Sequence, residues 1–200
     1  PKGLDTKITK EFINKKAAQS KMNMDVLESV VNQLSSAVAT GMPIDIAATI
    51  ITQGYQATSG LIKISAPFKY VSRKFEYAKE GKASDKTGKK YREEHNPPAS
   101  VVGASIILAI QNNAAKPVMG AIRKNYYQTQ LSKSDDTKID NAGLASKTLD
   151  GQTIFDNPIS RLAGADINLQ NLINPLNGKT IAEENGVGIN TKLYNNFSEN

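Results

Sequence analysis

The sequence predicts a mainly α protein, in which an irregular helical bundle is followed by a long, turn-rich and partly extended C-terminal segment. Two observations predict this fold class. Apolar residues recur at helical spacing through most of residues 5–130. From Leu131 onward they become sparse, while Asn, Asp, Gly, Ser and Thr dominate. We therefore expect a helical core over 1–130 and a polar, extended segment over 131–200 that docks on the core or on a partner.

The first forty residues predict two helices. Asp5 or Thr6 caps the first, and Asn23 followed by Asp25 starts the second, because short polar side chains satisfy the free amides of a helix start. The second helix carries the clearest amphipathic stripe of the chain, made of Val26, Leu27, Val30, Val31, Leu34 and Val38. Gly41 then suits a C-terminal glycine cap.

Three further helices are predicted before residue 130. One runs from Pro43 to about residue 53, one over 99–110 after a double proline, and one from Pro117 to about residue 128. Glycines at 54 and 60 weaken any continuation of the first, and Ala66-Pro67 marks a break. Over 67–79, aromatic and aliphatic side chains alternate with basic ones, from which we expect a basic amphipathic helix. The stretch 81–90 is a flexible basic loop.

The C-terminal segment is punctuated by turn signals. Asn-Pro or Asn-Gly pairs begin at residues 157, 174, 177 and 185. Single apolar anchors stand between them, and only residues 160–173 favour a short helix. A segment with this pattern can wrap along another surface without an interior of its own.

Composition excludes several classes of site. The chain has no cysteine, so disulfides, thiolate metal sites and cysteine nucleophiles are excluded. Its apolar runs are shorter than the roughly 20 residues of a membrane-spanning helix, so we expect no membrane contact. No phosphate-loop or dinucleotide-binding glycine pattern is present. We expect no cofactor and no metal. The start at Pro1 indicates either removal of an initial Met or release from a longer polypeptide.

The most unusual local sequence is Tyr91 to Pro98, which holds the only His beside two carboxylates. One interpretation makes Glu94 or His95 a general base, since the ordinary pKa of His lies near neutrality. A metal site needs further ligands, and no serine stands in a nucleophile elbow. The alternative interpretation is structural, with these side chains hydrogen-bonding a helix start and locking a tight corner. Glu94 and His95 are the catalytic candidates if the protein is an enzyme.

Positive charge is concentrated in one segment. Residues 1–100 carry 16 Lys+Arg against 10 Asp+Glu, whereas residues 101–200 carry 9 against 9. Basic residues can neutralise phosphates, and interleaved aromatic rings can stack on bases. The ordinary alternative is a solvated helix face. The candidate nucleic-acid-binding residues in segment 63–92 are Lys69, Arg73, Lys74, Lys79, Lys82, Lys86, Lys89, Lys90 and Arg92.

The stretch from Arg92 to Ala99, the apolar helix after it, and the run Asn125-Tyr126-Tyr127-Gln128 resemble segments of large, bacteriophage-encoded, virion-associated multidomain proteins. The resemblance covers about 40 residues and includes no catalytic signature. It implies a context, a virion or the host cytoplasm, and no site residues.

These observations favour a non-enzymatic structural or interaction component of a larger assembly: a phage virion-associated protein or a processed fragment of one. Its expected partners are other protein subunits. A nucleic-acid-binding protein that contacts DNA or RNA through segment 63–92 is the first alternative, and an enzyme centred on Glu94 and His95 is the second.

Overall fold

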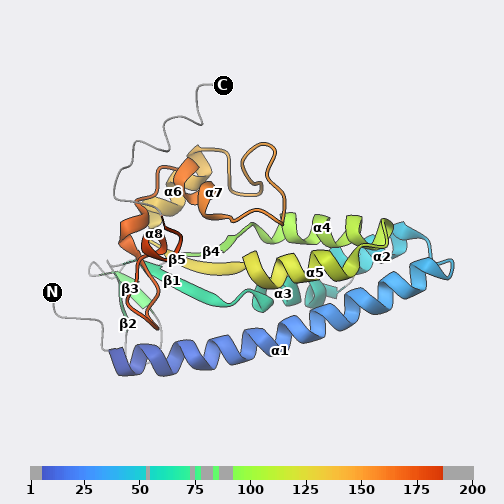
Figure 1. Cartoon of the computed structure of the whole chain (residues 1–200), viewed down its shortest axis with the longest axis horizontal. Helices are drawn as coiled ribbons and strands as arrows, with labels where there is room; N and C mark the ends of the chain where they lie inside the picture. Colours follow the sequence, from blue (N-terminus) through green and yellow to red (C-terminus); the bar gives the residue numbers. More distant parts are fainter. Residues whose placement is uncertain (1–5, 53–54, 73–74, 78–82, 86–91, 187–200) are drawn as a thin grey trace.

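The computed structural model describes residues 6–52, 55–72, 75–77, 83–85 and 92–186 (Figure 1). The described residues form eight α-helices, a short 3-10 helix and six strands, so the prediction of a mainly α protein is confirmed. The first helix runs along one side of a small sheet, the other longer helices extend beyond one end of its strands, and short helices and turns of the C-terminal segment lie on the opposite side (Figure 1).

The first helix, α1, is continuous over Thr6–Ala39, so the prediction of two helices with a start at Asn23 is wrong. Asn and Asp are acceptable inside a helix when the apolar stripe runs past them, and here it does. Among the side chains of α1 that the structure describes, the buried ones run from Ser20 through Met24 to Leu34. The helix ends as predicted, with Gly41 at a φ of 115°, a backbone conformation that favours glycine.

Four helices pack with α1 around the first apolar cluster: α2 (Ile44–Thr52), α3 (Tyr55–Ser65), α4 (Ala99–Gln111) and α5 (Ala115–Asn125). The predicted helices at 43–53 and 99–110 are confirmed. Gly60 lies inside α3, whose apolar residues pack on the cluster in spite of the glycine. The helix predicted from Pro117 to residue 128 starts two residues earlier and ends at Asn125, where a strand follows.

The sheet has the order β4-β5-β1-β6, with β1 (Phe68–Ser72) parallel to β5 (Tyr127–Leu131). Both outer strands, β4 (Arg92–Asn96) and β6 (Leu172–Ile173), are antiparallel to their neighbours. The basic helix predicted over 67–79 is therefore wrong. Aromatic and β-branched residues there fit a strand that is paired on both sides. A separate hairpin is formed by β2 (Phe75–Tyr77) and β3 (Ala83–Asp85), which lies in the predicted loop 81–90; the rest of that loop is outside the described residues.

The C-terminal segment forms α6 (Lys133–Asn141), α7 (Ile159–Gly164), the 3-10 helix η1 (Leu169–Asn171) and α8 (Ile181–Glu184). We expected a helix only within 160–173. Side-chain caps explain two of the others, because Ser132 accepts from the amide of Asp135, and Thr180 forms a capping box with Glu183.

A second apolar cluster lies between this segment and the sheet. Strands β1 and β5 supply Tyr70, Tyr127 and Leu131. The C-terminal segment supplies Leu172 from strand β6 and the remaining members, which are Ile139, Leu144, Ile159, Leu162, Ala165, Ile167, Leu169, Ile181 and Ala182. Residues 131–186 thus dock on the sheet and also contribute most of the buried side chains of the cluster. The sheet therefore borders the second cluster, while the first lies among the helices and includes no described strand residue.

Candidate functional site

The two catalytic candidates are adjacent residues of one strand, and they point to opposite faces of the sheet. β4 pairs with β5 so that Glu94 is opposite Thr129 and His95 is opposite Gln128. Successive side chains of a strand alternate between the two faces. Glu94 accordingly contacts the C-terminal segment, whereas His95 contacts α3 and Gln128 on the helical side. The two side chains cannot act on one substrate as a joined pair.

On its face of the sheet, Glu94 is paired with Arg161 of α7. The guanidinium is completely buried, and its Nη2 lies 2.5 Å from Oε1 of Glu94. Its Nη1 donates to Oδ1 of Asn96 at 2.7 Å. Nη1 also reaches the carbonyl of His95 at 3.3 Å, and the other donors reach backbone carbonyls of the C-terminal segment, with Leu144 O at 2.6 Å from Nη2 and Lys147 O at 3.2 Å from Nε. Arg161 therefore joins α7, the loop after α6 and strand β4.

The surroundings of Glu94 are rich in carboxylates. Burial raises the pKa of Glu94 above its ordinary value; Arg161 opposes this shift, while Asp136 and Asp140 add to it. Burial and then Asp140 likewise raise the pKa of Asp136, although Arg92 Nε lies 3.7 Å from a carboxylate oxygen of Asp136. The pairing of Glu94 with Arg161 offsets the desolvation of both groups, as a buried charge requires.

His95, on the helical face, is held between a helix end and a strand. Its Nε2 lies 3.1 Å from the carbonyl oxygen of Lys63 and 3.0 Å from Nε2 of Gln128, which itself donates to that carbonyl at 3.1 Å. Burial lowers the pKa of His95, so the ring is neutral at neutral pH. The tautomer decides which bond the ring makes: with the proton on Nε2 the ring donates to the Lys63 carbonyl, and with the proton on Nδ1 it accepts at Nε2 from Gln128. This arrangement fixes the end of α3 against the sheet, whereas the structural interpretation of the sequence expected these side chains to hydrogen-bond a helix start and lock a tight corner.

A pocket of about 370 Å³ opens on the face of the sheet that carries Glu93 and His95. Glu93, Gln128, Gln130 and Phe68 line it from the strands, and α1 and the end of α3 supply the opposite wall, from Lys16, Gln19, Ser20, Asn23, Ile64 and Ala66. Two of the wall side chains are held in place, since Gln19 donates to Asn23, and Asn23 donates to the carbonyl of Ile64 at 3.1 Å. The pocket is a polar recess, in which the Ser20 hydroxyl donates to the carbonyls of Lys16 and Ala66.

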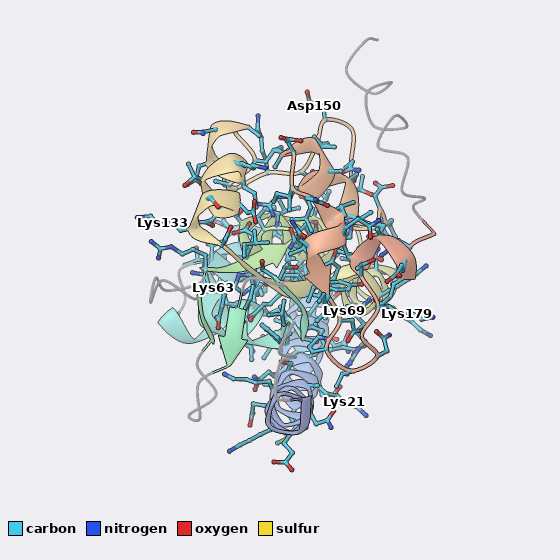
Figure 2. All side chains as sticks on the ribbon, turned by 90° about the vertical axis from the view of Figure 1, so that its left-hand side faces the viewer. Lys21, Lys63, Lys69, Lys133, Asp150 and Lys179 are labelled. Carbon is cyan, nitrogen blue, oxygen red and sulfur yellow. The ribbon has the colours of Figure 1, made fainter. Side chains whose placement is uncertain are left out.

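The structure describes two of the nine candidate nucleic-acid-binding residues, and each lies near a carboxylate. Lys69 Nζ is 3.8 Å from Glu184 and stands over the ring of Tyr70, 5.1 Å from its centroid. Arg92 is the residue near Asp136. Figure 2 shows Lys69 apart from Lys63, which begins the basic segment. The other seven candidates lie outside the described residues or have side chains outside them: Arg73, Lys74, Lys79, Lys82, Lys86, Lys89 and Lys90.

The sequence reading missed two polar centres. Arg161 is the first, and its signal is that it is the only basic residue between Lys147 and Lys179, next to apolar anchors. Glu184 is the second: it accepts from the Tyr70 hydroxyl at 2.6 Å and from Asn174 at 2.8 Å, which ties α8 to β1. It stands next to Glu183 in the first turn of α8.

Comparison with protein-family models, curated proteins and solved structures finds no match to the chain. Within the described residues, no three His, Asp or Glu side chains gather in a group that could hold a metal ion. In the same part of the chain, each helix is too short or too polar to cross a membrane.

Proposed function

We propose that the protein is a non-enzymatic structural and interaction component of a larger assembly. The observation that carries this proposal is that the two catalytic candidates, Glu94 and His95, are engaged in contacts within the fold. Glu94 is paired with the buried Arg161, and His95 is held between Lys63 and Gln128, on the opposite face of the sheet. Catalysis by a general base needs that base within reach of a substrate proton. Both candidates instead hold elements of the fold together.

Exposed apolar side chains support a role in interaction. Large apolar residues are exposed on several elements, including Leu108 on α4 at 57% and Phe155 in the loop before α7 at 59%. Scattered exposed apolar residues are ordinary on a monomer, but each becomes favourable to bury when a partner covers it. We propose other protein subunits as these partners.

We also propose a bacteriophage virion as the assembly. The support is the resemblance of the stretches 92–99 and 125–128, together with the helix between them, to virion-associated multidomain proteins. In the structure these stretches form β4, the start of α4 and the start of β5, which are neighbours in one sheet and its adjoining helix. The resemblance thus covers a contiguous structural unit.

The test is the composition of the native particle. Mass spectrometry of purified particles should find peptides of this chain at a fixed ratio to other subunits, and the mass of the intact polypeptide should show whether it is processed. Phe155→Ser and Leu108→Ser should each reduce incorporation, whereas His95→Gln, in a residue with an internal role, should leave it unchanged. A chain absent from the particle, or a chemical activity that His95→Gln abolishes, contradicts the proposal.

Nucleic-acid binding through segment 63–92 predicts a different result. A phosphate-contacting surface should bind DNA or RNA at low salt, and the affinity should fall steeply as salt rises. The pairing of Lys69 with Glu184 and of Arg92 with Asp136 reduces the charge that these two residues offer to phosphates. Under our proposal, the protein does not shift a labelled 30-nucleotide DNA or RNA at about 50 mM salt.

A further inference from the structure

The long helix α1 buries one side and leaves the other uncovered. Its buried side chains include Met24, Leu27 and Val31, whereas Met22 and Val26 are 62% and 53% exposed. One helical turn separates Met22 from Val26 and from the exposed Ala18, so the three residues lie in one row on the outer side. Seen along its axis in Figure 2, α1 forms one edge of the molecule, with the other elements on its inner side.

The charged residues of α1 differ in sign on the two sides of Met22, the middle residue of this row. α1 spans Thr6–Ala39, so Met22 lies at its midpoint. Every basic residue of α1 lies before Met22, and the exposed Lys15 and Lys21 are among them. After Met22 the helix has two charged residues, Asp25 and Glu28, both acidic. Before Met22 the helix has five Lys against one acid, Glu11, so its N-terminal half is net basic and its C-terminal half is acidic.

A shallow groove of about 640 Å³ follows the acidic half. It is lined by Asp25, Glu28, Ser29, Asn32, Gln33 and Ser36 of α1 and by Arg123 of α5. Arg123 lies 2.6 Å from Asp25 and also bonds Glu28. One guanidinium faces two carboxylates, so the groove keeps a net negative charge and suits a basic segment.

From this arrangement we infer that α1 pairs antiparallel with α1 of a second copy, about a two-fold axis close to Met22. Such an interface uses the same patch on both subunits, and every contact occurs twice. The apolar row of one copy meets that of the other at the centre. The basic half of each helix lies along the acidic half of its partner, which brings Lys21 toward Asp25 of the second copy. This geometry deepens the proposed function by naming one partner.

A single-cysteine experiment tests the geometry, because the chain has no cysteine of its own. Met22→Cys places two thiols next to the two-fold axis, and mild oxidation should give a covalent dimer. Ser36→Cys is the matched control on the same helix. Fourteen residues separate it from Met22, so in an antiparallel pair its two thiols stand about 40 Å apart and should not crosslink. Crosslinking of both variants, as a parallel or nonspecific pair would give, or of neither, overturns the inference.

Sedimentation of the chain without cysteine is the second test. We expect a concentration-dependent dimer that weakens as salt rises. Met22→Glu buries two charges at the axis and should weaken dimerisation at least about tenfold, while the exposed Gln111→Glu on α4 should leave it unchanged. A monomer at several hundred micromolar refutes the pairing. It leaves the proposed function to the particle analysis, which does not depend on a second copy.

Discussion

Replacing Arg161 by Leu tests whether the buried guanidinium joins the C-terminal segment to the sheet. The substitution removes a side chain with no exposed surface and leaves several acceptors without their donor. These are Oδ1 of Asn96, the carbonyls of Leu144 and Lys147, and the carboxylate of Glu94.

The magnitude follows from what each acceptor can do afterwards. Glu94 keeps 16% of its side chain exposed and can take up a proton, so its stranded charge costs less than a fully buried one. The buried Leu144 carbonyl and Asn96 Oδ1 cannot adapt in that way, and each buried acceptor without a partner costs about 1–3 kcal/mol, whereas the Lys147 carbonyl is only partly buried. Leu recovers part of this by filling the space with apolar atoms. We expect Arg161→Leu to lower the free energy of unfolding by about 3–5 kcal/mol.

The assay is urea unfolding followed by circular dichroism, with Arg123→Leu as the matched control. Arg123 also bonds two carboxylates, Asp25 and Glu28, but its side chain is 36% exposed. An exposed ion pair contributes roughly 0–1 kcal/mol. If Arg161→Leu costs no more than Arg123→Leu, the buried junction does not hold the segment on the sheet and the reasoning fails.

Two further predictions concern pH. Because burial raises the pKa of Glu94 in the fold, its titration favours the folded state below its ordinary pKa of 4.5, and this contribution is lost as pH rises through the folded-state pKa. The variant Glu94→Gln has no titrating group at this position. Relative to it, the wild type should lose free energy of unfolding as pH rises above about 4.5. A difference in the free energy of unfolding between the two proteins that does not change with pH would contradict this. For Glu184 the sign is opposite: burial acts to raise its pKa, but hydrogen bonds from Tyr70, Asn177 and Asn174 together lower it. Tyr70→Phe should cost about 1.5–3 kcal/mol at pH 7, and part of that loss should disappear as Glu184 is protonated in acid; an equal cost at pH 7 and about pH 3 would contradict it.

The sequence predicted most of the helices, because their signals are local. The stripe from Leu27 to Leu34, the glycine at 41 and the prolines at 67 and 97 each act within a few residues. The strands were missed because the signals that specify them are not local. The alternation of aromatic and basic residues after Pro67 has the period of a strand, but Lys69 and its neighbours suggested a solvated helix. Their strand exists because β5 and β6 pair with it from positions about 60 and 100 residues away.

The candidate site shows the same division between local and distant information. The sequence identified the stretch from Arg92 to Pro98 as unusual and weighed a structural role for it. It could not place Glu94 and His95 on opposite faces, since that depends on β4 being a strand. The partner of Glu94, Arg161, is 67 residues away in the chain. Nothing between them in the sequence indicates that contact.

The sheet belongs to the second apolar interior, since no described strand residue is part of the first. The first cluster is built almost entirely from residues 24–126, and the second combines residues 139–182 with Tyr70, Tyr127 and Leu131. The C-terminal segment therefore supplies most of one interior, but the floor of that interior is made by strands from the first part of the chain. Arg161 and Glu184 make polar contacts across this boundary, and both reach strands of the sheet. The exposed row on α1 lies on the far side of the first cluster, so substitutions at Arg161 and at Met22 act on separate parts of the molecule. Loss of the second interior and loss of self-pairing can for that reason be measured independently.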